Sequence, residues 1–215
     1  ILAICWLYRK KLLKVAYGAM RHPLLPSEER AFVANLAIAF FPAAIIGIMA
    51  HGFIKNVLFS PLVVSVMLVL GGIAILLIEK YKPEPKIDDV DHFSFALALK
   101  IGLCQCLAMI PGTSRSGATI MGAMLLGVGR KAATEFSFFL AIPTMLGATV
   151  YDLYKNWDLL SADGWQLIAI GFLSAFACAL IVVKTVVAFV AKHGFVPFAW
   201  YRIALGTLML WLLLR

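Results

Sequence analysis

Pro111-Gly112-Thr113-Ser114-Arg115-Ser116-Gly117-Ala118-Thr119 is a polar stretch between two apolar runs, residues 101–110 and 120–128. The stretch holds one fixed positive charge, four hydroxyl side chains, two glycines and a proline. A lipid-facing backbone could not form such a loop, because hydrocarbon offers no partners to its peptide groups. The stretch must therefore be buried in protein or line a wet cavity. An arginine at that depth indicates a functional site.

The rest of the chain is strongly apolar. Its 215 residues are 63% hydrophobic and only 14% charged, and the mean hydropathy is +0.95. Soluble domains do not have this composition, and the apolar runs are too long and continuous for an outer-membrane barrel. The composition therefore predicts an all-α, polytopic integral membrane protein. The net charge of +8 sits in short loops, where it sets topology, so we expect no nucleic-acid partner.

Five apolar segments are long enough to span a bilayer: residues 31–50, 61–78, 134–151, 165–190 and 197–214. Ser27 reads as the N-cap of the first, and Gly71-Gly72 in the second would let another helix approach closely. We expect a polar, basic loop over residues 9–30, in which Pro23 and Pro26 break any helix. The chain is read as one membrane domain, residues 1–215, with a polar linker over 79–92 between its halves.

The chain begins Ile1-Leu2-Ala3-Ile4-Cys5-Trp6-Leu7-Tyr8, followed by a basic cluster. This apolar stretch is far shorter than a span needs. We therefore expect that the chain starts partway through a transmembrane helix and that an N-terminal part is missing.

Lysine and arginine are unevenly distributed among the polar segments. Segments 9–30, 79–92 and 129–133 carry six, three and two of them, whereas 51–60 and 152–164 carry one each. The positive-inside rule therefore places the first three in the cytoplasm. Residues 93–128 then leave the cytoplasmic side and return to it, although their second arm is too short to cross. This predicts a re-entrant helix–loop–helix whose tip, Pro111 to Ser116, lies near mid-membrane.

The polar stretch has the chemistry of a phosphate site. Read as a loop, Ser114 to Gly117 leads into a short helix over residues 118–128, whose N-terminus offers unpaired N–H groups and a positive dipole end. Arg115 supplies a planar fork matched to phosphate oxygens, and the two glycines let backbone approach a ligand closely. The predicted phosphate ligands are Gly112, Thr113, Ser114, Ser116, Gly117 and Thr119. Alternatively, Arg115 pairs with an acid or with helix C-terminal carbonyls and only fixes the fold.

Other polar side chains receive simpler interpretations. Gln105 is expected to make an interhelical hydrogen bond, and Glu135 to lie in the first turn of its helix. The four cysteines lie inside apolar segments and are expected to be packing residues. The histidines lie in loops or at helix ends without metal-ligand spacing. We therefore expect no metal site within this chain.

At the central motif the sequence resembles the undecaprenyl-pyrophosphate phosphatase family of the bacitracin-resistance type. Pro111 to Thr119 matches the family signature Pro-Gly-x-Ser-Arg-Ser-Gly-x-Thr. Similarity continues over Glu135-Phe136-Ser137-Phe138, residues 143–155, Pro197-Phe198 and Tyr201-Arg202. The resemblance implies transmembrane helices with two re-entrant hairpins in an inverted repeat, of which this chain would hold half or more.

The resemblance also implies a function. Members hydrolyse undecaprenyl diphosphate to the monophosphate, which recycles the lipid carrier for peptidoglycan synthesis and gives bacitracin resistance. The location implied is the bacterial inner membrane, with the site open to the periplasm. Arg115 would be the catalytic residue that stabilises charge on the diphosphate. A polyprenyl diphosphate lipid would be the partner, and a homodimer is an assembly to test.

The chain departs from the family in one respect. It lacks the acidic Glu-x-x-x-Glu signature, followed by a serine and a histidine, that should precede residue 1. That segment would supply the nucleophile or base and the ligands of a divalent cation, Mg or Ca. We therefore expect these 215 residues alone to release no phosphate. Two other readings stay open: a transporter or flippase of a phosphorylated polyprenyl lipid, and a purely structural membrane component.

Overall fold

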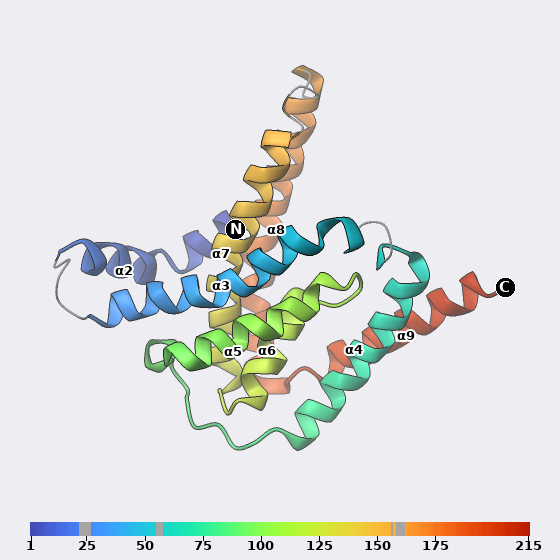
Figure 1. Ribbon diagram of the computed structural model, residues 1–215, viewed down its shortest axis with the longest axis horizontal. Coiled ribbons are helices and arrows are strands. Elements are labelled where there is room, and N and C mark those ends of the chain that lie inside the picture. The colour runs from blue at the N-terminus through green and yellow to red at the C-terminus, as the bar shows by residue number, and fades with distance from the viewer. Residues whose placement is uncertain (22–26, 55–57, 156, 158–161) are drawn as a thin grey trace.

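The computed structural model describes residues 1–21, 27–54, 58–155, 157 and 162–215. The described residues fold into helices (Figure 1). In chain order these are α1 Leu2–Leu7, α2 Arg9–Arg21, α3 Glu28–Phe53, α4 Pro61–Tyr81, η2 Val90–His92, α5 Phe95–Cys106, η3 Leu107–Met109, α6 Arg115–Leu125, α7 Arg130–Lys155, α8 Ala162–His193 and α9 Val196–Leu213.

Five helices in the described part of the chain are long and apolar enough to cross a membrane, which confirms the predicted spans. They are α3, α4, α7, α8 and α9. Ser27 caps α3 as predicted, since its Oγ accepts a hydrogen bond from the Arg30 N–H at 3.3 Å. Ser60 caps α4 in the same way, and Pro61 follows at the first helical position, where its missing N–H costs nothing.

Two predicted loops are partly helical. Residues 9–21 of the expected basic loop form α2. There, Leu12 and Val15 provide the apolar face of an amphipathic helix and Lys10 and Lys14 the polar face. Pro23 and Pro26 lie outside the described residues. The linker expected over 79–92 is also shorter, because α4 continues to Tyr81.

The three segments predicted to be cytoplasmic lie together at one end of the molecule. The Lys11 ammonium is 2.9 Å from the Asp91 carboxylate, and the Gly129 N–H donates to the Ile87 carbonyl at 2.8 Å. The Asp91 N–H donates to the Asp89 carboxylate, which lowers the pKa of that carboxyl, and Lys11 lowers it further. Segment 93–128 therefore starts and ends at the same place. Its depth in the membrane stays a prediction.

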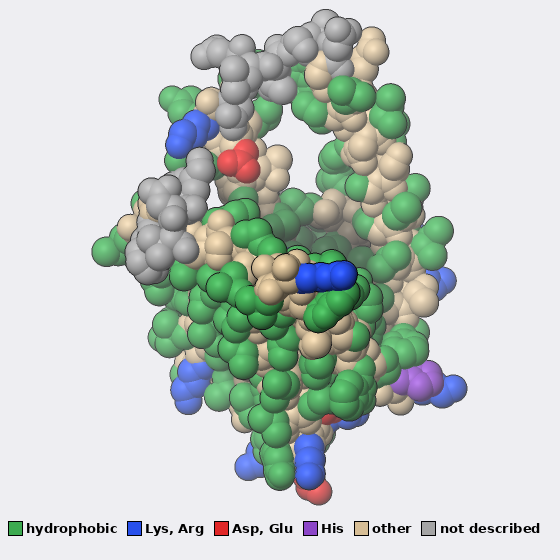
Figure 2. Space-filling view, turned by 90° about the vertical axis from the view of Figure 1, so that its right-hand side faces the viewer, with side chains coloured by type: hydrophobic (Ala, Val, Ile, Leu, Met, Phe, Trp, Pro, Cys, Tyr) green, Lys and Arg blue, Asp and Glu red, His purple; other side chains and the backbone are tan. Residues whose placement is uncertain are grey.

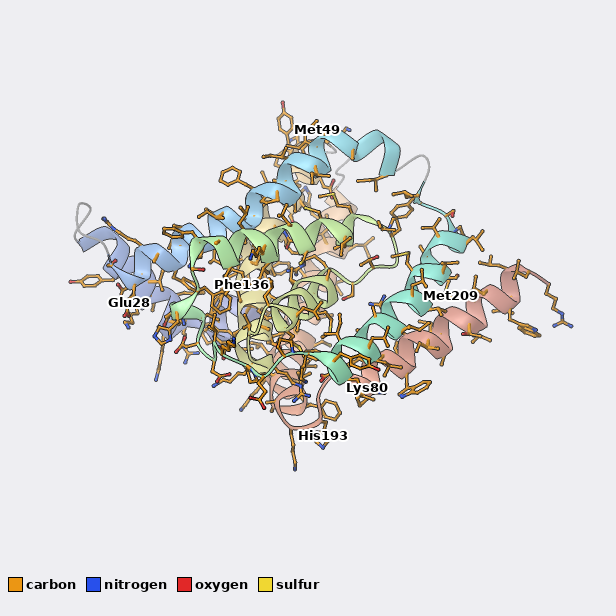
Figure 3. The ribbon with its side chains drawn as sticks, turned by 60° about the horizontal axis from the view of Figure 1, so that its bottom comes forward. Glu28, Met49, Lys80, Phe136, His193 and Met209 are labelled. Atoms are coloured by element: carbon orange, nitrogen blue, oxygen red, sulfur yellow. The ribbon has the colours of Figure 1, made fainter. Side chains whose placement is uncertain are left out.

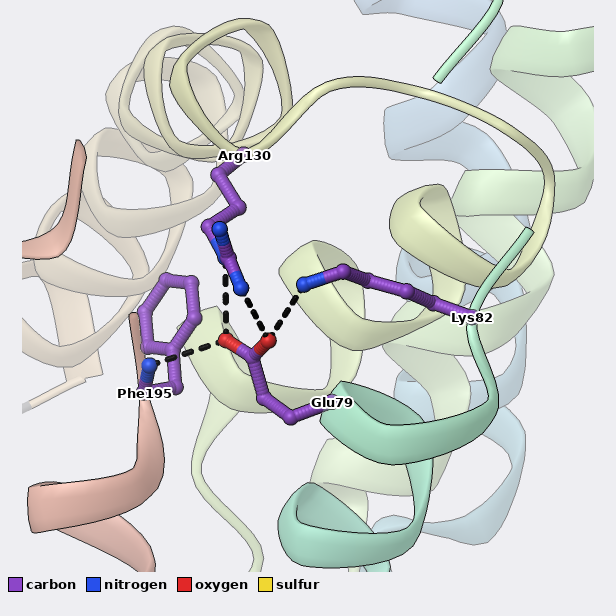
Figure 4. A network of polar contacts seen from close by, with 4 residues as sticks. All are labelled: Glu79, Lys82, Arg130 and Phe195. Atoms are coloured by element: carbon purple, nitrogen blue, oxygen red, sulfur yellow. Dashed lines mark hydrogen bonds and ion pairs between the residues drawn. The ribbon is translucent and has the colours of Figure 1, made fainter. Parts of the chain in front are cut away.

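A carboxylate network ties this end together (Figure 4). The Glu79 carboxylate accepts from Arg130 Nη2 at 2.6 Å and Nε at 3.1 Å. It also accepts from Lys82 Nζ and from the Phe195 N–H. Bidentate pairing with a guanidinium is a strong, directional contact. The network therefore joins the end of α4, the start of α7 and the α8–α9 turn.

The protein core is small and the lipid-facing surface is large. Phe136 lies in the interior (Figure 3), where it packs with Phe93, Phe139, Ile101 and Met124. The face in Figure 2 is covered mainly by hydrophobic side chains, with few charged ones. No residue of the most apolar window of α8 is buried within the protein. Such a surface is expected where helices contact lipid rather than water.

Helix α4 packs mainly against α9, beside the rest of the helices (Figure 1). A Cβ on Gly72 would lie 2.8 Å from the Ala199 carbonyl oxygen. Only glycine allows two helix backbones to approach this closely. The prediction that Gly71-Gly72 lets another helix approach is confirmed, and that helix is α9.

Candidate active site

The short helix of the central motif begins earlier than the sequence predicted. Helix α6 starts at Arg115, not at residue 118, and Ser114 is its N-cap. The Ser114 Oγ accepts from the Gly117 N–H at 3.1 Å, the usual geometry of a serine cap. Arg115, Ser116 and Gly117 therefore form the first helical turn instead of a loop.

The guanidinium of Arg115 is held against α7. Its Nη1 donates to the Ser137 carbonyl at 3.1 Å. None of the ion pairs among the described residues involves Arg115. The alternative reading expected an acid or helix C-terminal carbonyls as the partner, but the carbonyl that anchors Arg115 lies in the N-terminal half of α7. A guanidinium has five N–H donors, so this single contact leaves capacity for an anion.

Gly112 contacts protein backbone. Its φ is +89°, a left-handed conformation that favours glycine. A Cβ at this position would lie 2.5 Å from the Val64 carbonyl oxygen of α4. The sequence interpretation gave Gly112 the task of bringing backbone close to a ligand. The structure shows that it also brings the loop close to α4, and its approach to a ligand stays a prediction.

Arg202 of α9 contacts the central motif, and the sequence reasoning did not select it. Its Nη2 donates to the Gly112 carbonyl at 2.9 Å and to the Met67 carbonyl at 3.2 Å. Gly71 lies beside the guanidinium and leaves room for it. An arginine within a predicted span was the signal that could have identified it. Arg202 joins α4, α9 and the loop before α6.

The hydroxyl groups of the motif have different surroundings. Ser114 Oγ and Ser116 Oγ are 3.3 Å apart at the start of α6. Thr113 Oγ1 is buried without a partner among the described residues. Thr119 Oγ1 is buried and lies 2.7 Å from Ser137 Oγ, so it fastens α6 to α7. The predicted role of each hydroxyl as a phosphate ligand stays a prediction.

A cavity of about 650 Å³ lies beside Arg115. Its walls come mainly from the C-terminal halves of α3 and α7, which contribute Phe40, Ala43, Ala44, Gly47, Ile48, Thr144, Gly147, Ala148 and Tyr151. The α5–α6 hairpin supplies Gln105, Ala108, Met109 and Arg115. An apolar cavity with a few converging polar groups is the usual form of a ligand site.

Two polar side chains differ from expectation. Gln105 makes no hydrogen bond with a described residue, so the predicted interhelical bond is wrong. Glu135 follows the start of α7 at Arg130 by five residues, so it lies in the second turn rather than the first.

The resemblance to phosphatases implies a divalent cation. Hard cations such as Mg²⁺ and Ca²⁺ prefer carboxylate oxygens, and the described residues of the cavity lining include no carboxylate. Nor do the described residues contain a group of three or more metal-ligating side chains. These residues therefore do not form the expected cation site.

The fold and the site together define a class: a multi-pass α-helical membrane protein with an arginine-bearing helix N-terminus beside an apolar cavity. The family model described as "Bacitracin resistance protein BacA" matches residues 1–208. The chain belongs to this family.

Curated relatives agree with the family match. The chain is 55% identical over its whole length to undecaprenyl-diphosphatase 2 of Paramagnetospirillum magneticum, and the match covers 80% of that protein. It is 53% identical to undecaprenyl-diphosphatase of Acinetobacter baumannii over 98% of this chain and 76% of the relative. The corresponding protein of Cereibacter sphaeroides is 48% identical over 100% of this chain and 79% of its own length.

Proposed function

We propose that this protein hydrolyses undecaprenyl diphosphate to undecaprenyl phosphate and phosphate. The reaction recycles the lipid carrier for peptidoglycan synthesis, and it confers bacitracin resistance. One observation carries the proposal: a single cavity places the Arg115 guanidinium next to apolar walls of α3 and α7. A polyprenyl diphosphate complements both features, since its head group is anionic and its chain is apolar. Family membership supports the same function.

Arg115 is the proposed catalytic residue. In the hydrolysis, water attacks the terminal phosphorus and the bridging P–O bond breaks, so charge develops on the transferred phosphoryl oxygens. A guanidinium fixed by the Ser137 carbonyl is already oriented before this charge appears. The first N–H groups of α6 add the positive end of a helix dipole. We propose Gly112, Thr113, Ser114, Ser116 and Gly117 as the surrounding diphosphate site, and that Thr119 supports it through Ser137.

We propose that the group that activates water lies outside the described lining of this cavity, whose residues include neither a carboxylate nor a histidine. We propose that the acidic segment implied by the family resemblance supplies the base, together with any Mg or Ca ligands. Transport without hydrolysis is not favoured, because the curated relatives are named diphosphatases.

We further propose that the site faces the periplasm from the inner membrane. The cavity is built on the C-terminal halves of α3 and α7. The basic segments gather at the opposite ends of these helices, where Lys14 lies near Glu29 and Arg130 binds Glu79. If the basic end is cytoplasmic, the cavity lies toward the other side. That two copies of the protein form a homodimer is a separate proposal, and it does not rest on any contact described here.

Filling the cavity should weaken substrate binding. A Cβ on Gly147 would have only Phe40 Cζ near it, at 4.0 Å, so Gly147→Leu fits the fold and occupies cavity space. We expect KM for farnesyl diphosphate and undecaprenyl diphosphate to rise by about tenfold or more, with the melting temperature unchanged. Gly171→Leu on α8 is the matched control, because nothing lies within 4 Å of that position. Equal KM values for both variants would reject the cavity as the substrate site.

A further inference from the structure

Gln105 lies buried beside the cavity with its amide unused. It is 2% exposed, and neither Nε2 nor Oε1 has a hydrogen-bond partner among the described residues. Buried amides nearly always have partners, because an unpaired buried polar group costs free energy. Gln105 lines the same cavity as Arg115. An unpaired amide in a cavity wall indicates a ligand.

The position of Gln105 is fixed by tight helix packing. Gly102 lies one turn earlier on α5, and a Cβ there would be 2.5 Å from the Ala39 carbonyl oxygen of α3. The two backbones are thus in direct contact, which prevents α5 from rotating. Ile101 and Gln105 share the buried side of α5. The amide is therefore presented by a rigid element, as a precise binding group should be.

We propose that Gln105 is a second ligand of the substrate's diphosphate, acting together with Arg115; this rests on the proposed function above. The amide nitrogen has two donors and the amide oxygen is an acceptor. Nε2 donates to a phosphoryl oxygen, and Oε1 accepts from a water molecule that accompanies the head group. A neutral amide adds hydrogen bonds without adding charge, so the arginine remains the electrostatic anchor.

The test uses the detergent-solubilised protein and farnesyl methylenediphosphonate, a diphosphate analogue that is not hydrolysed. Gln105→Met removes both polar atoms and keeps the side-chain length. We expect Kd for the analogue to rise about ten- to a hundredfold, because a hydrogen bond to a charged group is lost. The melting temperature without ligand should stay the same or rise, since an unpaired buried amide is removed. Gln166→Met, at an exposed position on α8, should change neither the Kd for the analogue nor the melting temperature.

A second variant keeps the shape and changes the charge. Gln105→Glu places a carboxylate against the phosphates, so its Kd should rise more than that of Gln105→Met. Wild-type affinity in either variant would overturn the inference. So would a fall in melting temperature that parallels the fall in affinity, because that indicates a purely structural amide. Arg115→Ala in the same assay separates the role of Gln105 from the proposed function. If the Arg115→Ala variant also binds the analogue normally, the proposed diphosphate site itself is wrong.

Discussion

Replacing Arg115 with alanine is expected to reduce phosphate release from undecaprenyl diphosphate by about a thousandfold or more. Among the described residues that line the cavity, Arg115 is the one with a cationic side chain. Its loss leaves the developing phosphoryl charge to the α6 N-terminus alone. Folding should survive, because the Arg115 guanidinium makes one hydrogen bond with the described residues, to the Ser137 carbonyl. The measurement is kcat/KM of the full-length enzyme in liposomes, together with its melting temperature.

Arg115→Lys should be almost as severe, because an ammonium has no planar fork and cannot bind two phosphate oxygens side by side. Arg9→Ala is the control: Arg9 is exposed, donates to the Trp6 carbonyl and is not among the residues that line the cavity. Turnover within tenfold of wild type in Arg115→Ala would refute the role given to this residue.

Gly112→Ala is expected to have the second largest effect. The residue has φ of +89°, and an added Cβ would lie 2.5 Å from the Val64 carbonyl oxygen. The loop must therefore move away from α4, which also disturbs the Gly112 carbonyl that Arg202 holds. We expect a loss of about 1–3 kcal/mol in the free energy of unfolding, with at least a tenfold loss of kcat.

Gly127→Ala separates the cost of a side chain at positive φ from the cost of the clash with α4. Gly127 has a similar φ of +83° but nothing within 4 Å of its Cβ position. It should show only the conformational cost of about 1 kcal/mol, with kcat unchanged. If the two variants lose the same stability and activity, the close contact with α4 has no role in the site.

The spans and the polar hairpin follow from the sequence because both depend on local composition. A run such as 61–78 is apolar over its whole length, and the Ser27 cap has a local signal. The start of α6 was placed three residues late because Gly117 suggested a loop. In the structure, the Ser114 cap to the Gly117 N–H outweighs the low helix propensity of glycine.

The missed features all depend on contacts between distant segments. Helix α2 contains many charged residues, and its apolar face stabilises a helix only because Val15 is buried against the rest of the fold. Arg202 reaches Gly112 across ninety residues of sequence. The unpaired amide of Gln105 could not be foreseen either, since an interhelical bond is the common outcome for a glutamine in a span. All three features depend on how the helices pack against one another, and the hydrophobic periodicity of the sequence does not specify that packing.

The central claim is that the cavity between α3, α7 and the α5–α6 hairpin holds the lipid diphosphate. Photo-cross-linking tests it most directly, with a farnesyl diphosphate analogue that carries a benzophenone on the chain. We predict adducts on the cavity-facing residues of α3 and α7, such as Ile48, Ala148 and Tyr151. Undecaprenyl diphosphate should compete for them, and Arg115→Ala should abolish them. Adducts confined to the outer surface of α8, or adducts on α3 and α7 that persist without Arg115, would contradict the account.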